Sequence, residues 1–275
     1  MITSSASLDY VRELVYQRAG IVLGVDKNYL IEARLATLAR ELKLASVEEV
    51  VTAARGEQAR KLNPRIVEAL TTNETTFFRD VHPFNALRDH VIPGLLAARS
   101  ATEPLRIWSA ACSTGQEPYS IAMLLKTHFP SLPSGRVKIL GTDVAESILA
   151  RAREARYRQL EINRGLPAAL MVKFFERDGT DWTLESGIRS MVEFNQFNLV
   201  TPSTPFPQAD IVFLRNVLIY FDEATRGGVL RRVRAALAPD GYLFLGCAET
   251  TASVPDMFER VHIGSTVCHR PRNPA

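Results

Sequence analysis

The stretch LRIWSAACSTGQEPYSIAM, residues 105–123, runs from a short apolar segment through small residues into a helix-like segment. Similar apolar segments recur in VKILGTD (137–143), DIVFLRN (210–216) and GYLFLG (241–246), with helix-like sequence between them. Short, nearly continuous apolar runs are typical of strands buried on both faces, and their alternation with helices is the α/β pattern. The sequence therefore predicts a parallel sheet that begins near residue 104.

Three other parts of the chain lack this pattern. Residues 1–72 carry apolar residues at helical spacings, and Pro64 is placed to begin a helix. Between residues 159 and 194, WTLE and IRSMVEF alternate with a period of two, which predicts a small antiparallel insertion. The stretch MFERVHIGSTVCHR predicts a final antiparallel hairpin. We therefore expect a helical N-terminal domain over 1–72, a linker that starts a binding site over 73–95, and an α/β domain over 96–275.

The bulk composition argues against several classes of protein. The chain has 275 residues and a net charge of +3, too small for a protein that wraps nucleic acid or coats an anionic membrane. Neither a signal peptide nor an apolar run of membrane-spanning length is visible. Three cysteines without paired spacing, and His82 and His90 eight residues apart, argue against a disulfide framework or a metal site. We expect a cytoplasmic protein without metal, nucleic-acid partner or membrane insertion.

Polar residues follow the predicted strands at the points where the strands end. Asp143 ends one run, Asn198 and Leu199 follow VEFNQF, and Asn216 and Val217 follow DIVFLR. Ligands of open α/β sheets bind beyond the carboxyl ends of the strands, so these residues are candidate ligand contacts. The bend ACSTGQEP matches neither the GxGxxG nor the GxxxxGK[ST] phosphate-binding pattern. A carboxylate, two amides and a bend of small residues suit a nucleoside that carries an amino-acid tail.

The same residues also have ordinary structural interpretations. Asp143 followed by Glu146 matches a capping box, and Glu117 favours the start of a helix. Asn198 and Asn216 are common turn formers. The residues by themselves leave both interpretations open.

A second unusual stretch, LTTNETTFFRD at residues 70–80, places hydroxyls and an amide before two phenylalanines and an arginine. With IWSAACSTGQEPYSIAM, GTD, VEFNQFNL and FLRNVLIYFD, in this order and spacing, it resembles the chemotaxis receptor methyltransferases, the CheR family. These enzymes use S-adenosyl-L-methionine to methylate glutamate side chains of bacterial chemoreceptors, and they release S-adenosyl-L-homocysteine. The resemblance covers nearly the whole chain. It implies an all-α N-terminal domain followed by a Rossmann-like methyltransferase domain with a small antiparallel β insertion.

The resemblance also implies a set of site residues. The implied cofactor contacts are Asn73, Thr75, Arg79, Glu117, Asp143, Asn198, Leu199, Asn216 and Val217. A glutamate has an unperturbed pKa near roughly 4.3, so it is already ionised at neutral pH and needs placement rather than a strong base. We expect Arg79 to orient a carboxylate and Tyr220 to lie near the transferred methyl group as the catalytic pair. We expect Phe77 and Phe78 to anchor the loop.

Two departures from the family pattern are visible in the sequence, and the second concerns the partner. Cys247-Ala248-Glu249 stands where members often have His-Ser-Glu, and no site is assigned there. The segment 177–192 is short for the loop with which some members bind a peptide at the receptor C-terminus. The implied partner is therefore the cytoplasmic domain of methyl-accepting chemoreceptors, without a C-terminal peptide tether. In the helical domain, Arg34, Arg40 and Lys43 form either an ordinary solvated face or a contact for acidic receptor segments.

Two other functions fit parts of the pattern. One is a methyltransferase with the same cofactor that acts on RNA or a small molecule, and the near-neutral charge argues against RNA. The other is a non-enzymatic sensor of the cofactor. The presence of Arg79, Asp143 and Tyr220 argues against a site that has lost catalytic activity.

Overall fold

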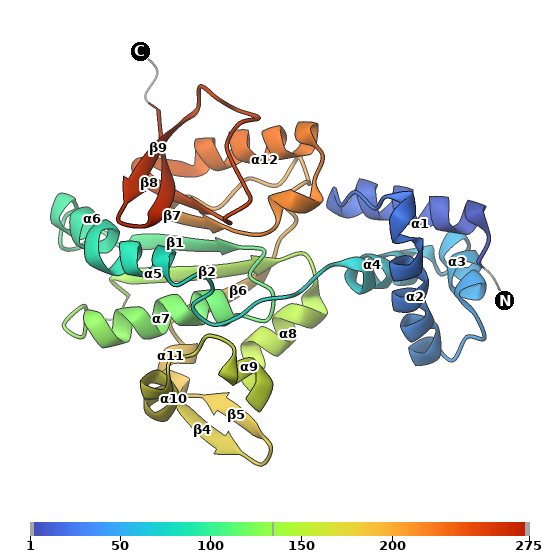
Figure 1. Cartoon of the computed structure of the whole chain (residues 1–275), viewed down its shortest axis with the longest axis horizontal. Coiled ribbons are helices and arrows are strands. Elements are labelled where there is room, and N and C mark those ends of the chain that lie inside the picture. The colour runs from blue at the N-terminus through green and yellow to red at the C-terminus, as the bar shows by residue number, and fades with distance from the viewer. Residues whose placement is uncertain (1–2, 134, 273–275) are drawn as a thin grey trace.

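The computed structural model describes residues 3–133 and 135–272, which form a helical part and an α/β part (Figure 1). The helical part is a bundle of α1 (Ser5–Ala19), the 3-10 turn η1 (Val25–Lys27), α2 (Asn28–Leu42), α3 (Val47–Arg55) and α4 (Ala59–Leu70). Serine side chains cap two of these helices, because Ser4 accepts a hydrogen bond from the N–H of Ser7 and Ser46 from that of Glu49.

The expectation that Pro64 begins a helix is wrong, because Pro64 lies inside α4, which begins at Ala59. An internal proline leaves one helical hydrogen bond unmade. The earlier start places Leu62, which is 1% exposed, in the core of the bundle. Burial of this leucine contributes about 1.5–3 kcal/mol toward the cost of the internal proline, which is about 3 kcal/mol.

A linker connects the bundle to the α/β part. Residues 71–81 form no regular helix or strand and lead into a broken helix made of α5 (His82–Ala86), the π-helical turn η2 (Leu87–Val91) and α6 (Ile92–Ala98). In Figure 1 this linker runs past the carboxyl ends of the central strands. The linker is therefore in position to close over a ligand bound at those ends.

The α/β part is built on a seven-stranded sheet with the order β6-β2-β1-β7-β8-β10-β9. Its strands are β1 (Leu105–Ala110), β2 (Val137–Asp143), β6 (Val192–Gln196), β7 (Ala209–Leu214), β8 (Leu237–Leu245), β9 (Phe258–Ile263) and β10 (Thr266–Pro271). The first five in this order are parallel, and β9 and β10 form the predicted antiparallel hairpin at one edge. The predicted α/β fold class is confirmed.

The central strands are largely apolar because both faces of the sheet are buried there. In β7, Ile211 and Phe213 face one hydrophobic core while Val212 and Leu214 face the other. One core contains α7 (Gln116–His128) and the α5–α6 region. The other contains α12 (Glu223–Ala236) and continues into the helical bundle. The bundle therefore shares a core with the α/β part.

The small antiparallel sheet begins before residue 159 and ends before residue 194, so its bounds differ from the expected 159–194. Its three strands, in the order β3-β5-β4, are β3 (Arg156–Arg158), β5 (Asp181–Leu184) and β4 (Phe175–Asp178). WTLE forms most of β5 as expected, but IRSMVEF does not pair with it. Val192–Gln196 is instead the parallel edge strand β6 of the main sheet, because Val192 and Phe194 bury their side chains there.

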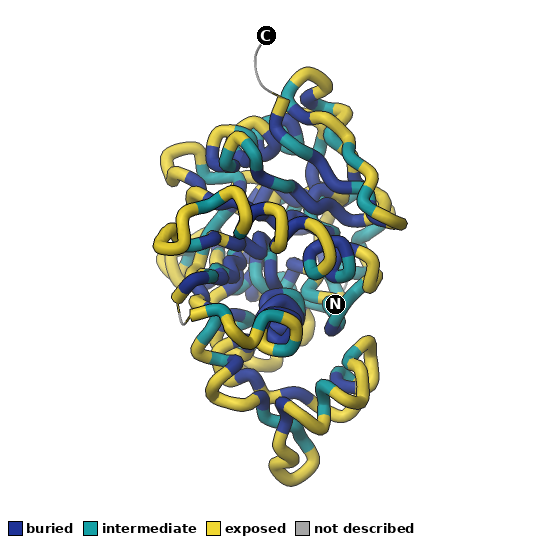
Figure 2. The backbone as a smooth tube through the Cα atoms, turned by 90° about the vertical axis from the view of Figure 1, so that its left-hand side faces the viewer, coloured by how far each residue is buried: buried dark blue, intermediate teal, exposed yellow. Residues whose placement is uncertain are grey.

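The remaining helices lie partly on the main sheet and partly in the lobe with the small sheet. They are α8 (Glu146–Glu154), α9 (Gln159–Asn163), α10 (Ala168–Phe174), α11 (Ser186–Arg189) and the 3-10 turn η3 (Leu218–Tyr220). Figure 2 shows the strands of the main sheet buried inside the molecule, while the lobe with the small sheet projects with exposed turns. No helix in the described ranges is both long and apolar enough to cross a bilayer.

Candidate active site

A cavity lies beyond the carboxyl ends of β1, β2, β6 and β7, where the chain order of the sheet reverses on either side of β1. Such a reversal leaves a crevice that commonly binds ligands. Every predicted site residue lines this one cavity: Asn73, Thr75, Arg79, Glu117, Asp143, Asn198, Leu199, Asn216, Val217 and Tyr220. The structure thus brings together residues that are up to about 150 positions apart in the sequence.

The bend after β1 forms the floor of the cavity. Ala111 and Ser113 have φ angles of 54° and 52°, in the left-handed region that non-glycine residues seldom occupy. The backbone N–H of Ser113 donates to Asp143 at 2.9 Å, and its hydroxyl donates to the carbonyl of Asn73 at 2.8 Å. These bonds hold the bend against β2 and against the linker. Strained backbone of this kind concentrates at ligand sites.

Asp143 is buried at the end of β2. It is 6% exposed and accepts hydrogen bonds from the N–H groups of Ser113 and Ala145, the latter at 3.1 Å. Burial raises the pKa of its carboxyl, and the hydrogen bonds from backbone N–H groups partly offset that rise. The capping-box interpretation is wrong, because α8 has Ala145 as its N-cap and the N–H of Glu146 donates to Glu68 instead.

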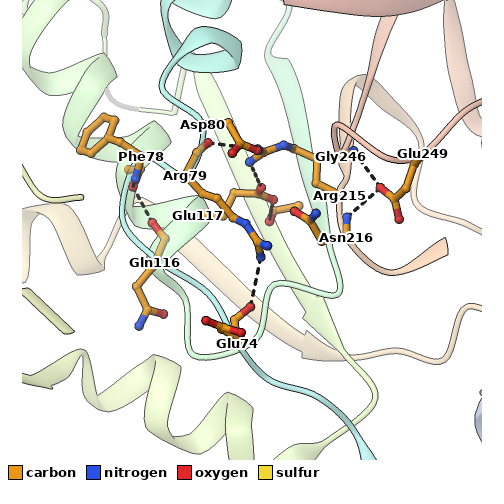
Figure 3. Close-up of polar contacts among 12 residues, drawn as sticks. Glu74, Phe78, Arg79, Asp80, Gln116, Glu117, Arg215, Asn216, Gly246 and Glu249 are labelled. Carbon is orange, nitrogen blue, oxygen red and sulfur yellow. Dashed lines mark hydrogen bonds and ion pairs between the residues drawn. The ribbon is translucent and has the colours of Figure 1, made fainter. Parts of the chain in front are cut away.

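Glu117 belongs to a charge network around the buried Arg215 that the sequence did not reveal (Figure 3). Its carboxylate accepts from the Ser109 hydroxyl at 2.7 Å and from Arg215 at 2.9 Å. The same Arg215 side chain, 2% exposed, also donates to Asp80 at 2.6 Å and to the carbonyl of Arg79 at 3.0 Å. Arg215 therefore fastens the linker to the end of β7, and its position at the end of a buried apolar strand was the signal available in the sequence.

Arg79 lines the cavity, and its guanidinium makes few polar contacts within the described residues. It donates to the carbonyl of Glu74 at 3.3 Å and takes part in none of the ion pairs found within residues 3–133 and 135–272. Its neighbours Phe78, Asp80 and Val81 all have positive φ angles, of 47°, 68° and 50°. A guanidinium on a constrained loop and without a carboxylate partner is available to an anionic ligand.

The two phenylalanines hold this loop in place. Phe77 is fully buried and makes edge contacts with Tyr157 and Phe175 at centroid distances of 5.0 and 5.6 Å. The backbone N–H of Phe78 donates to the Ser120 hydroxyl at 2.9 Å, and its ring packs on Phe84 at 5.2 Å. These contacts fix the residues on the N-terminal side of Arg79.

The helical bundle supplies part of the cavity wall, which the sequence did not signal. Ala19 and Ile21 line the cavity. Ile21 forms an antiparallel bridge with Phe221, and the N–H of Val22 donates to the carbonyl of Tyr220 at 2.9 Å. The bundle therefore holds the segment that carries the predicted catalytic tyrosine.

Asn198 has both a structural and a cavity-facing position. Its side-chain oxygen accepts from the N–H of Val200 at 3.1 Å, and its amide nitrogen donates to the carbonyl of Arg18 at 2.6 Å. The first bond is the turn-forming pattern expected of asparagine. Leu199 is buried beside it.

Across the described ranges, no group of three or more His, Cys, Asp or Glu side chains is arranged to hold a metal ion.

Comparison with known proteins matches both parts of the chain. The family model described as "CheR methyltransferase, all-alpha domain" matches residues 6–71, and "CheR methyltransferase, SAM binding domain" matches residues 73–267. Chemotaxis protein methyltransferase 1 of Pseudomonas aeruginosa is 38% identical over 98% of this chain and 99% of its own length. The chemotaxis protein methyltransferase of Escherichia coli is 36% identical over 93% of this chain and 88% of its own length.

Among solved structures, the chain partly matches the glycopeptide N-methyltransferase MtfA complexed with S-adenosyl-L-homocysteine. It is 16% identical, covers 74% of this chain and 62% of its own, and has a TM-score of 0.37.

Proposed function

This chain belongs to the CheR methyltransferase family, and from that premise we propose that it methylates glutamate side chains in the cytoplasmic domain of methyl-accepting chemoreceptors. Its cofactor is S-adenosyl-L-methionine. The proposal places the protein in the cytoplasm, where that receptor domain lies. The observation that carries it is the single cavity in which linker residues and strand ends meet.

The walls of the cavity fit the chemistry of the cofactor. A buried carboxylate, Asp143, suits the ribose hydroxyls, and Asn198 with Leu199 suits the base. The bend at Ala111 and Ser113 brings backbone close to the ligand. The remaining proposed contacts are Asn73, Thr75, Arg79, Glu117, Asn216 and Val217. When bound, S-adenosyl-L-methionine supplies an electrophilic methyl group on a sulfonium.

The residues of this chain are proposed to position the reactants rather than to move protons. The acceptor glutamate is ionised at neutral pH because its unperturbed pKa is roughly 4.3, so no strong base is required. Arg79 would orient one carboxylate through a charge-assisted hydrogen bond. Tyr220 would close the cavity beside the acceptor and exclude water. Fixed orientation and reduced hydration are the contributions to rate that we assign to this site.

The structure bears on how the receptor would be bound. β4 and β5 are joined through Gly179 and Thr180, so the small sheet has only a short turn at this point. A short turn supports binding without a C-terminal peptide tether.

In the bundle, Arg34 is half-buried and donates to the carbonyl of Thr71, whereas Arg40 and Lys43 are exposed. Of the three cations, Arg40 and Lys43 are the ones available to acidic receptor segments.

The test is transfer of a labelled methyl group to purified receptor cytoplasmic domain, with RNA as the competing acceptor. A glutamyl methyl ester releases methanol under alkali, whereas a methylated base does not. We expect alkali-labile label on the receptor with the wild-type protein and its loss with Arg79→Ala. Alkali-stable label on RNA, or no transfer to the receptor, would contradict the proposal.

A further inference from the structure

Glu249 lies after the end of β8, in a segment to which the sequence analysis assigned no site. Its side chain is buried, and the residue is 8% exposed. One carboxylate oxygen accepts hydrogen bonds from the N–H groups of Asn216 and Gly246, both at 2.7 Å (Figure 3). The other oxygen accepts from the N–H of Ile219 at 3.3 Å. The carboxylate is thus held by backbone donors from the ends of two neighbouring strands.

Within residues 3–133 and 135–272, this carboxylate has no cationic side chain as an ion-pair partner. None of the ion pairs of the described residues involves Glu249. A buried charge must be compensated, and here the three N–H groups do this. Hydrogen bonds to an ionised acceptor are stronger than neutral ones, so the N–H groups are held firmly in place.

The two strand ends approach each other closely at this point. Asn216 has a φ angle of 60°, in the left-handed region that asparagine adopts more readily than most residue types. A Cβ atom on Gly246 would lie 2.7 Å from the Asn216 side-chain nitrogen and 2.8 Å from a carboxylate oxygen of Glu249. The arrangement therefore depends on glycine at position 246.

The segment that Glu249 holds carries three of the predicted site residues. Asn216, Val217 and Tyr220 line the cofactor cavity, and Ile219 lies between them in the sequence. Glu249 itself is absent from the walls of that cavity and lines two neighbouring ones. Its hydrogen bonds to Asn216 and Ile219 therefore connect it to the cofactor cavity through the loop 216–220.

We propose that Glu249 is a positioning residue, whose carboxylate fixes the backbone of loop 216–220 so that Asn216 and Val217 meet the cofactor and Tyr220 faces the acceptor. This inference rests on the proposed function for the role of Tyr220. Its effect on cofactor binding does not depend on the identity of the acceptor.

The test compares Glu249→Gln with Glu249→Asp and with the matched control Glu259→Gln, which changes an exposed glutamate of β9. Glutamine offers one oxygen and turns an NH₂ group toward backbone donors, so it cannot accept all three hydrogen bonds. Aspartate keeps the charge but is shorter. The quantities measured are the affinity for S-adenosyl-L-homocysteine by calorimetry, kcat and KM with receptor, and the exchange rates of the Asn216 and Ile219 amides.

We expect Glu249→Gln to weaken cofactor-product affinity about tenfold, which corresponds to roughly 1.4 kcal/mol, and to lower kcat by a similar factor. KM for the receptor should stay unchanged, and both amides should exchange faster. Glu249→Asp should recover part of each loss, and it remains informative if the glutamine variant does not fold. Glu259→Gln should match the wild type.

A purely structural role would give a lower Tm with unchanged affinity and kcat at temperatures where the variant is folded, and that result would overturn the inference. Equal losses in Glu259→Gln would also overturn it. If the wild type forms no alkali-labile ester, the proposed function fails, while the calorimetric and exchange results still decide the role of Glu249.

Discussion

On the β1–β2 side of the cavity, the bend at Ala111 and Ser113 is held by hydrogen bonds from backbone and hydroxyl groups, with Asp143 as its single buried carboxylate. On the β7–β8 side, the rim is held by charges: Arg215 joins Glu117 and Asp80, and Glu249 holds the loop 216–220. Buried charges are costly when one partner is removed. The β7–β8 side should therefore be the more sensitive to single substitutions.

The largest effect is expected for Arg215→Met. Removal of the guanidinium leaves Glu117 and Asp80 without their cation, and breaking a buried pair costs about 3–5 kcal/mol. Because Asp80 is partly exposed, with a side-chain accessibility of 34%, we expect the lower end of this range. The free energy of unfolding in urea measures it, and Arg177→Met on the exposed small sheet is the control. Equal stability of the two variants would show that the charge network does not hold the rim.

Arg79→Ala should affect activity rather than folding. Its guanidinium makes one long hydrogen bond to a carbonyl in the structure, so its loss should change the free energy of unfolding little. A hydrogen bond to a charged group contributes about 1.5–3 kcal/mol, so kcat/KM should fall by roughly 10- to 150-fold. Arg79→Lys should recover part of the activity. An alanine variant with normal ester formation and normal cofactor affinity would remove Arg79 from the site.

The pH dependence of the unfolding free energy, compared between the wild type and Asp143→Asn, tests the β1–β2 side of the cavity. Burial raises the pKa of the Asp143 carboxyl, so the folded protein binds that proton more tightly than the unfolded chain does. This contribution favours folding below the unfolded pKa of roughly 3.9, and it is lost as the pH rises through the folded pKa. The unfolding free energy of the wild type should therefore fall relative to that of Asp143→Asn as the pH rises. A pH-independent difference between them would contradict the assigned burial.

The same substitution should weaken binding of S-adenosyl-L-homocysteine about tenfold, because one hydrogen bond from the ligand to a charged acceptor is lost. Glu193→Gln, on the exposed face of the edge strand β6, is the control. Calorimetric titration of both variants at neutral pH measures the difference. Unchanged affinity in Asp143→Asn would place the ribose elsewhere.

The smallest effect is expected far from the rim. Charge reversal by Arg40→Glu with Lys43→Glu should weaken receptor methylation by a few fold, since exposed ion pairs contribute about 0–1 kcal/mol each. The loss should be larger at low salt because ions screen exposed charges. Lys138→Glu, near the amino end of β2, is the control. Unchanged methylation kinetics at all salt concentrations would make this surface an ordinary solvated face.

The β1–β2 side could be predicted from local sequence. Small residues after an apolar run indicate a bend at a strand end, and Asp143 follows directly from the end of its strand. Because carboxyl ends of parallel strands meet at one edge, the sequence also placed Asn198 and Asn216 near the same ligand site. The strands β1, β2, β7 and β8 followed from the apolar runs alone.

The β7–β8 side could not be predicted in the same way, because its interactions join distant segments. Nothing near Arg215 in the sequence indicates that its partner is Asp80, which lies 135 positions away. The contribution of Ile21 to the cavity depends on how the bundle packs on the α/β part. Strand β6 was misassigned to the insertion because alternation over a few residues does not specify which sheet a strand joins.

The decisive measurement is a crystal structure of the protein with bound S-adenosyl-L-homocysteine. We expect the nucleoside between Asp143 and Asn198, with its amino-acid tail under the linker near Arg79. A ligand bound outside this cavity, or a 73–79 segment that lies away from the ligand, would show that the linker and the strand ends do not form one cofactor site.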